Sequence, residues 1–258
     1  MLASLAQDDV SFMKLADLIE KDPVMAGNLL HLVNSALYAR RGSINSVRHA
    51  LSLLGINKLR NAVLGMSITR MWNQVRTPPS WSMARFNMHS AAAAILSDLL
   101  AQRLNVNYSE GAFVAGLLHD VGRLLTAIGL NAEYTRILQM HEKDGKPLVE
   151  CEREVLGFAH PELSADALVF WNLPEQIQNA VRFHHNPAGD RSASDLTLSR
   201  VLDAANQYVN SMGVSILKKC TDAADETLVE SLGLPADRLE LILADFKAEY
   251  DAMSQFFR

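Results

Sequence analysis

The sequence predicts an all-α protein, and three features support this fold class. From Val10 onward, apolar residues recur at three- and four-residue spacing almost to the end of the chain, which is the period of helices with one buried face. Strict alternation of apolar and polar residues, which is typical of strands, is nowhere sustained over six residues. Glycine and proline number only 13 and 8 among 258 residues, so the composition also favours helices.

Short helices are expected in the first part of the chain. Asp22-Pro23 opens one helix, Ser43 caps a second, and the turn at Gly55 precedes a third over residues 59–72. The prolines within residues 77–80 then interrupt the pattern, because each removes a backbone donor. This break is too short for an independent linker, so we expect two fused helical subdomains that share a continuous apolar interface, over residues 1–76 and 80–258.

The helices expected after this break are longer. Ser80 and Ser109 are the predicted caps of the first two, and Asn186-Pro187 marks a second interruption. The predicted helices cover about residues 80–104, 112–125, several segments up to 185, 196–212 and 236–257.

Charge and cysteine content exclude several classes of protein. The net charge is −5 and the charges are interspersed, so we expect no nucleic-acid partner. The first twenty residues contain several charges and no uninterrupted apolar run approaches about 18 residues, so we expect neither a signal peptide nor a membrane partner. The two cysteines, Cys151 and Cys220, form no CxxC pair, which fits a soluble protein of a reducing cytoplasm.

Several of the eight histidines fall on apolar faces of the predicted helices. Imidazole and carboxylate are ligands of iron, manganese, zinc and nickel, and three to six of them on neighbouring helices would make a site for one or two metal ions. Taken singly, a buried histidine is more often a hydrogen-bonded core residue, so the pattern leaves both interpretations open. The inward residues are His89, His119, Asp120, His160, His184 and His185, whereas His31, His49 and His141 are expected elsewhere.

Two groups of motifs resemble a known family. The first is Ile19 to Val24, Leu29 to Tyr38 with its Asn34-Ser35 pair, and Ile44 to Gly55, which resembles the opening of the HD-related output domain (HDOD) of bacterial signalling proteins. The second resembles the histidine–aspartate (HD) phosphohydrolase core and comprises residues 115–122, 154–157 with His160, 171–174 and 184–187. The resemblance covers about residues 10–215 and implies that the second subdomain is an HD-superfamily helical bundle. It also implies that the family domain begins several residues before Met1.

The resemblance further implies a ligand set. The first metal histidine of the HD superfamily falls on His89, and the His-Asp pair falls on His119 and Asp120. The additional histidines of the related HD-GYP cyclic-di-GMP phosphodiesterases fall on His160, His184 and His185. The implied cofactors are one or two divalent transition-metal ions, of Fe, Mn, Zn or Ni, in a pocket that also contains Arg123, Asp203 and Asn206.

Three departures from the family pattern oppose catalysis. Asn206 stands where the superfamily has its last aspartate, with Asp203 one turn earlier as a substitute. Arg123 stands where HD-GYP enzymes have a lysine, and a guanidinium does not release a proton at neutral pH. No Gly-Tyr-Pro follows His185. An amide also gives a cation less charge than a carboxylate, so anion binding could survive where turnover does not.

These observations favour a regulatory output module of bacterial signal transduction without efficient catalysis. Its expected partner is a signalling protein or a phosphate-containing small molecule. The alternative is a metal-dependent phosphohydrolase of the HD superfamily, whose catalytic residues the sequence does not assign. A helical scaffold with buried histidines and no ligand is a variant of the first interpretation.

Overall fold

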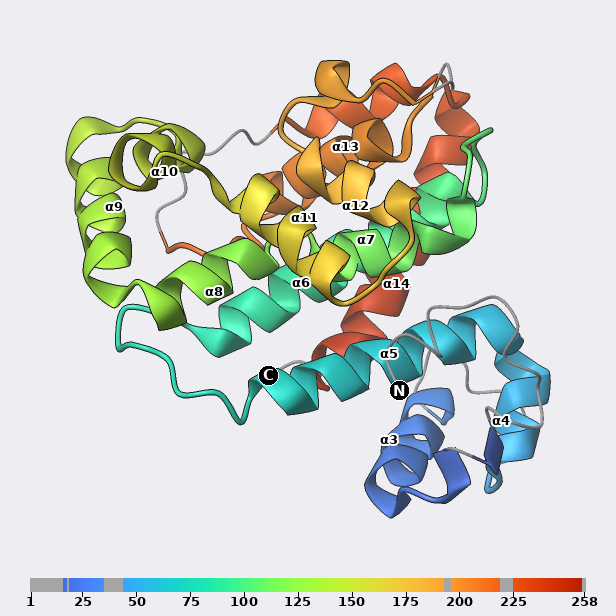
Figure 1. Cartoon of the computed structure of the whole chain (residues 1–258). Coiled ribbons are helices and arrows are strands. Elements are labelled where there is room, and N and C mark those ends of the chain that lie inside the picture. The colour runs from blue at the N-terminus through green and yellow to red at the C-terminus, as the bar shows by residue number, and fades with distance from the viewer. Residues whose placement is uncertain (1–15, 18, 35–43, 193–195, 219–224, 257–258) are drawn as a thin grey trace.

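A computed structural model of the chain confirms the all-α fold (Figure 1). The structure describes residues 16–17, 19–34, 44–192, 196–218 and 225–256, and none of these residues lies in a strand. The labelled helices drawn in blue and cyan form a lower group in Figure 1, and the helices that follow them form a larger group above. The labelled helices of the lower group are α3 (Pro23–Val33), α4 (Val47–Leu54) and α5 (Ile56–Trp72).

Side-chain caps set the boundaries of the lower group. The carboxylate of Asp22 accepts hydrogen bonds from the first amides of α3, as the Asp22-Pro23 pair predicts. Asn34 then joins the end of α3 to the start of the next segment, because its amide donates to Ile44 O at 2.7 Å and its oxygen accepts from Ile44 N at 2.8 Å. Ser46 caps α4, and Ser43, the cap expected from the sequence, lies outside the described residues.

The helix predicted from residue 80 begins later than expected. Its cap is Ser82 rather than Ser80, and α6 runs from Met83 to Ala101. Residues 79 and 80 form a turn, and the Trp81 side chain is buried against Phe86 with the ring centroids 5.2 Å apart. We attribute the choice of Ser82 over Ser80 as the cap to the packing of this indole.

The apolar helix predicted over residues 112–125 is interrupted, which corrects the prediction. After a short 3-10 turn, α7 (Ala112–Leu118) ends at His119, and α8 (Val121–Gly129) begins after Asp120. The His119 Nδ1 atom lies 2.7 Å from Gly116 O, the carbonyl that the Asp120 amide would use in a continuous helix. Residues 109–129 are the one described stretch long and apolar enough to cross a bilayer, and 89% of its most apolar window is buried inside the protein.

The upper group is completed by helices that pack on α6, α7 and α8. Their bounds are α9 (Asn131–Asp144), α10 (Leu148–Leu156), α11 (His160–Phe170), α12 (Glu175–Arg182), α13 (Leu198–Ser211) and α14 (Ala236–Ser254). Helix α11 packs on α8 and α12, α13 packs on α6 and α12, and α14 packs on α6. The C-terminal helices predicted at 196–212 and 236–257 are present with shorter bounds.

One buried apolar cluster runs through both groups of helices. Helix α14, drawn in red, passes between α5 and the upper group in Figure 1. Lys58 of α5 pairs with Glu249 of α14, and His31 Nε2 lies 3.1 Å from Gln255 Oε1 just after α14. The C-terminal helix therefore links the N-terminal helices to the bundle, while the division of the chain at residues 77–80 stays a prediction.

Two glycines allow the helices around the bundle centre to approach closely. A Cβ atom at Gly116 would lie 2.6 Å from the Cα atom of Ala94, on α6. A Cβ atom at Gly122 would lie 2.4 Å from His160 O, at the start of α11. Both obstacles are backbone atoms, which no change of rotamer can move. Helix α7 thus needs glycine to reach α6, and α8 needs glycine to reach α11.

We expect Gly116→Ala to lower the free energy of unfolding by about 2 kcal/mol, because the added methyl group would force α6 and α7 apart. Gly129→Ala is the matched control, since a Cβ atom there meets no other atom within 4 Å. The control should leave stability unchanged or raise it by up to about 1 kcal/mol. Urea unfolding of both variants measures the difference, and equal stabilities would refute the close-packing argument.

The pH dependence of stability is expected to contain a contribution from Asp98 of α6. Burial raises the pKa of this carboxyl to about 6; the Gln102 hydrogen bond, at 2.6 Å, lowers it and the Glu249 charge raises it. The unfolded chain therefore releases this proton first, and stability is lost as the pH rises from about 4 to about 6. Asp98→Asn should stabilise the protein by up to about 3 kcal/mol at about pH 8 and by much less at about pH 4.5. Urea unfolding at both pH values is the test, and a pH-independent difference would contradict it.

Candidate metal centre

The six predicted ligand residues converge at the centre of the upper bundle, at or near the ends of its helices. His119 and Asp120 occupy the break between α7 and α8, and His160 is the first residue of α11. His184 and His185 follow the end of α12, whereas His89 lies within α6. The six side chains form two groups, and within each group the potential ligand atoms lie within 4.8 Å of one another. The groups are His89, His119 and Asp120, and Asp120, His160, His184 and His185.

Asp120 belongs to both groups and lies between them. Its Oδ2 atom is 3.6 Å from His89 Nε2 and 3.5 Å from His119 Nε2. Its Oδ1 atom is 3.0 Å from His160 Nε2 and 3.6 Å from His184 Nε2. Ligands about 2.1 Å from one ion are separated by about 3.0 Å in an octahedral and about 3.4 Å in a tetrahedral arrangement. These separations therefore match those between ligands of a common ion.

Hydrogen bonds to the outer ring nitrogens orient four of the imidazoles. The Nδ1 atoms of His89, His119 and His184 lie 2.8, 2.7 and 2.6 Å from the carbonyl oxygens of Val214, Gly116 and Val181. A carbonyl oxygen can only accept, so Nδ1 carries the proton and Nε2 of the neutral ring presents a lone pair. The fourth anchor is the Glu152 carboxylate, whose Oε2 lies 2.7 Å from His160 Nδ1.

Some inner atoms of the cluster are acceptors that face other acceptors. His89 Nε2 lies 3.3 Å from His119 Nε2, and both rings carry their proton on Nδ1. His160 Nε2 lies 3.2 Å from His185 Nε2. His184 Nε2 and Asp120 Oδ2 are buried without a hydrogen-bond partner in the part of the chain that the structure describes. Buried acceptors that face one another are unfavourable unless a cation lies between them. The donor set and these orphaned atoms therefore fit a transition-metal ion.

The electrostatics favour the protonation states that metal binding requires. Burial lowers the pKa of His89, His119 and His185, which keeps these rings neutral. Burial alone would raise the pKa of Asp120, but the charge of Arg123, whose Nε lies 3.3 Å from Oδ1, holds it well below its usual value. Three neutral imidazoles thus lie near a charged carboxylate.

Comparison with known proteins places this arrangement in a family. The family model of the HDOD domain matches residues 1–187 of the chain. The chain belongs to the HDOD family. An uncharacterized protein of Treponema pallidum (strain Nichols) is 23% identical over 194 residues, which cover 71% of this chain and 35% of that relative. The chain therefore spans about a third of the length of the relative it matches.

Solved structures share the fold of this HDOD chain. An HDOD domain protein of unknown function from Geobacter sulfurreducens superposes with a TM-score of 0.78 at 23% identity, over 99% of this chain and 89% of its own. A candidate phosphohydrolase from Shewanella amazonensis SB2B superposes with a TM-score of 0.72 at 22% identity, over 100% of this chain and 93% of its own. At this identity the likeness concerns the fold.

The three further pocket residues predicted for the HDOD site lie at different places. Arg123 is buried beside Asp120. Asp203 and Asn206 lie on α13 and bond within that helix, to Gln207 at 2.8 Å and to Asn210 at 3.4 Å. Burial raises the pKa of Asp203 and its bond to Gln207 lowers it, and Asp203 lies outside both ligand groups.

Glu152 is a site residue that the sequence interpretation missed. Besides holding His160 Nδ1, its Oε2 atom accepts from the His160 amide at 2.8 Å, and the side chain is only 3% exposed. The spacing of Leu148, Cys151 and Glu152 places the carboxylate on the apolar face of α10. A carboxylate on an apolar face is the sequence feature that could have identified Glu152 as a site residue. Glu152 raises the pKa of His160 against the effect of burial.

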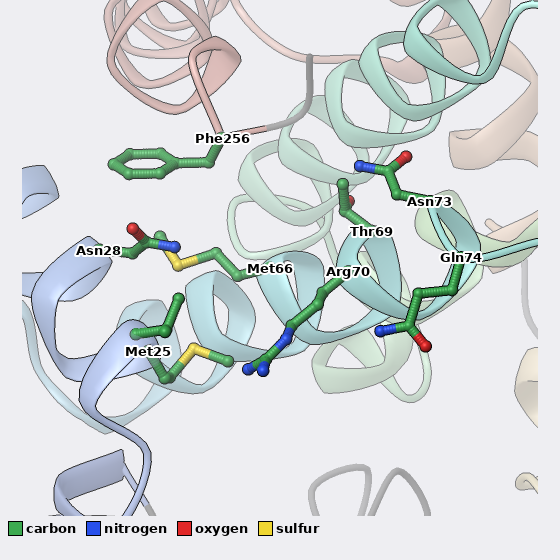
Figure 2. Close-up of a pocket in the computed structure, with 9 residues that line it drawn as sticks. Met25, Asn28, Met66, Thr69, Arg70, Asn73, Gln74 and Phe256 are labelled. Atoms are coloured by element: carbon green, nitrogen blue, oxygen red, sulfur yellow. The ribbon is translucent and has the colours of Figure 1, made fainter.

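The remaining histidines lie away from the centre, as expected. His31 contacts Gln255, and His141 Nδ1 lies 2.7 Å from Lys146 O, while His49 is exposed on α4. A cavity of about 360 Å³ also lies elsewhere, between α3, α5 and Phe256 (Figure 2). Its methionine and phenylalanine side chains face amide groups and Arg70, and it contains none of the ligand residues.

We expect Glu152→Gln to weaken metal binding about 10- to 100-fold, because the amide removes the charge that holds His160 Nδ1–H. Glu154→Gln, which removes the exposed partner of Lys146 on the same helix, is the control and should leave affinity unchanged. Competition with a chromophoric chelator measures both affinities. Equal weakening of metal binding in both variants would mean that the loss of any negative charge lowers the affinity, and it would contradict the specific role of Glu152.

Proposed function

We propose that this HDOD domain is a metal-binding regulatory module of bacterial signal transduction that does not catalyse efficient turnover. The observation that carries the proposal is the convergence of five imidazoles and one carboxylate in a centre that is buried apart from His185. Five of these six side chains are at most 2% exposed, and their inner acceptor atoms need a cation.

Closure of the centre supports a regulatory rather than a catalytic role. Catalytic metal sites keep a coordination position open to water or substrate, whereas structural sites are closed by protein ligands. Asp120 and Arg123 are 1% and 5% exposed, so a phosphate group would have to displace packed side chains to reach them. Two residues support the same conclusion. Asn206 gives a metal ion no negative charge where the resembled enzymes have an aspartate. Arg123 releases no proton at neutral pH where the HD-GYP enzymes have a lysine.

His89, His119, Asp120, His160, His184 and His185 would hold one or two ions of Fe, Mn, Zn or Ni. A bound cation would supply the positive charge that joins the α6–α7 side of the bundle to the α11–α12 side. The carbonyl anchors keep His89, His119 and His184 in the tautomer that presents Nε2, and the Glu152 carboxylate holds His160 Nδ1. Proposed partners are a signalling protein or a phosphate-containing small molecule in the bacterial cytoplasm, with neither nucleic acid nor membrane as a ligand.

A metal-dependent phosphohydrolase is the second candidate, and one observation favours it. The two ligand groups share Asp120, and a shared carboxylate is the arrangement with which two neighbouring cations are held for phosphoester hydrolysis. Arg123, a phosphate-binding type of residue, lies beside that carboxylate.

The test is metal analysis of the full chain purified without chelators, combined with phosphodiesterase and phosphomonoesterase assays in added manganese or iron. We expect about one or two bound ions per chain, lost in His119→Ala, with no hydrolysis above background. His141→Ala, a buried histidine outside the centre, is the control and should retain the metal.

Asn206→Asp adds a carboxylate to the family position and is expected to leave the assay without turnover, because the centre stays closed. A native chain without metal would refute the module proposed here. Robust turnover that His119→Ala abolishes would instead establish the phosphohydrolase.

A further inference from the structure

The segment after α13 is fastened to α6 by Arg85. Arg85 Nε donates to Ile216 O at 3.1 Å, and Nη2 donates to Leu217 O at 2.8 Å and to Ser215 Oγ at 3.4 Å. The Ser215 hydroxyl also donates to Leu217 O at 2.7 Å. One planar guanidinium therefore holds three consecutive residues of a segment that has no helical hydrogen bonds of its own.

The same segment provides the anchor of His89. Val214 directly precedes the fastened residues, and its carbonyl oxygen lies 2.8 Å from His89 Nδ1. Arg85 and His89 are four residues apart on α6 and so share one face of that helix. The segment is consequently held at two successive turns of α6, first by Arg85 and then by the ligand itself.

We propose that Arg85 is a positioning residue that fixes the orientation and tautomer of His89 through the 214–217 segment. The inference rests on the metal centre proposed above. Without the guanidinium, the carbonyls of Ile216 and Leu217 each lose one donor, and Val214 is held mainly by its amide bond to Val209 O at 3.2 Å. The Val214 carbonyl then becomes a less well fixed acceptor for the Nδ1 proton of His89, and the Nε2 atom of His89 is directed less precisely toward His119 and Asp120.

The experiment compares Arg85→Ala and Arg85→Lys with the native full chain, using Co²⁺ alone as the probe. We expect Arg85→Ala to weaken Co²⁺ binding about 10- to 100-fold and Arg85→Lys to have an intermediate effect, because one ammonium cannot span both carbonyls. Arg70→Ala is the control, since it removes an arginine bonded to Asp22 at 2.7 Å, far from the centre, and should leave Co²⁺ affinity unchanged.

A double-mutant cycle with His89→Ala separates positioning from general destabilisation. If Arg85 acts through His89, Arg85→Ala will not weaken Co²⁺ binding further once His89 is alanine. An equal additional loss in that background would overturn the proposal, as would unchanged affinity in Arg85→Ala.

A second readout does not need the metal. In the metal-free chain, ¹⁵N–¹H correlation spectra of the imidazoles should show His89 protonated at Nδ1 in the native chain and in Arg70→Ala, and a mixture of tautomers in Arg85→Ala. A native chain that binds no Co²⁺ would refute the proposed centre alone, and the spectra would then decide the role of Arg85. An unaltered His89 tautomer in Arg85→Ala would overturn that role.

Discussion

The structure depends on one constraint, which is that several imidazole lone pairs and one carboxylate meet in the middle of a protein core. Such groups repel one another, and water is excluded from them. The surrounding helices must nevertheless approach closely enough to bring the nitrogens within 3–4 Å of Asp120, which requires a bare backbone at Gly116 and Gly122. Packing and electrostatics thus oppose each other at this point, and the metal ion proposed above would reconcile them.

The centre is built largely from helix ends. His119 and His184 each follow the last turn of a helix and bond to the carbonyl three residues earlier, one of the carbonyls that a helix end leaves without a partner. The same bond satisfies the backbone and sets the tautomer of the ligand. His160 uses the opposite end, where Glu152 holds both its amide and its ring. Ligand geometry and helix termination are therefore parts of one local structure.

Sequence reasoning could predict most helices and the residues that form the candidate centre, because spacing and short motifs are local properties. It could not predict the break between α7 and α8, since the apolar pattern runs through His119 unaltered and the interruption comes from a side chain that takes a backbone acceptor. Glu152 resembles the exposed glutamates on either side of it until α10 is seen against α11. The choice between Asp203 and Asn206 depends on how α13 is rotated in the bundle, which long-range packing decides.

Closure of the centre also has a kinetic consequence. An ion whose surrounding side chains are almost fully buried, apart from His185, would exchange slowly while the helices stay packed, so its exchange would depend on transient local opening of the bundle. The residence time of such an ion would follow the frequency of that opening rather than the strength of its bonds. The domain would then take up its metal chiefly while it folds. The ion found in a folded domain would reflect the metals available in the cell during folding, not those available later.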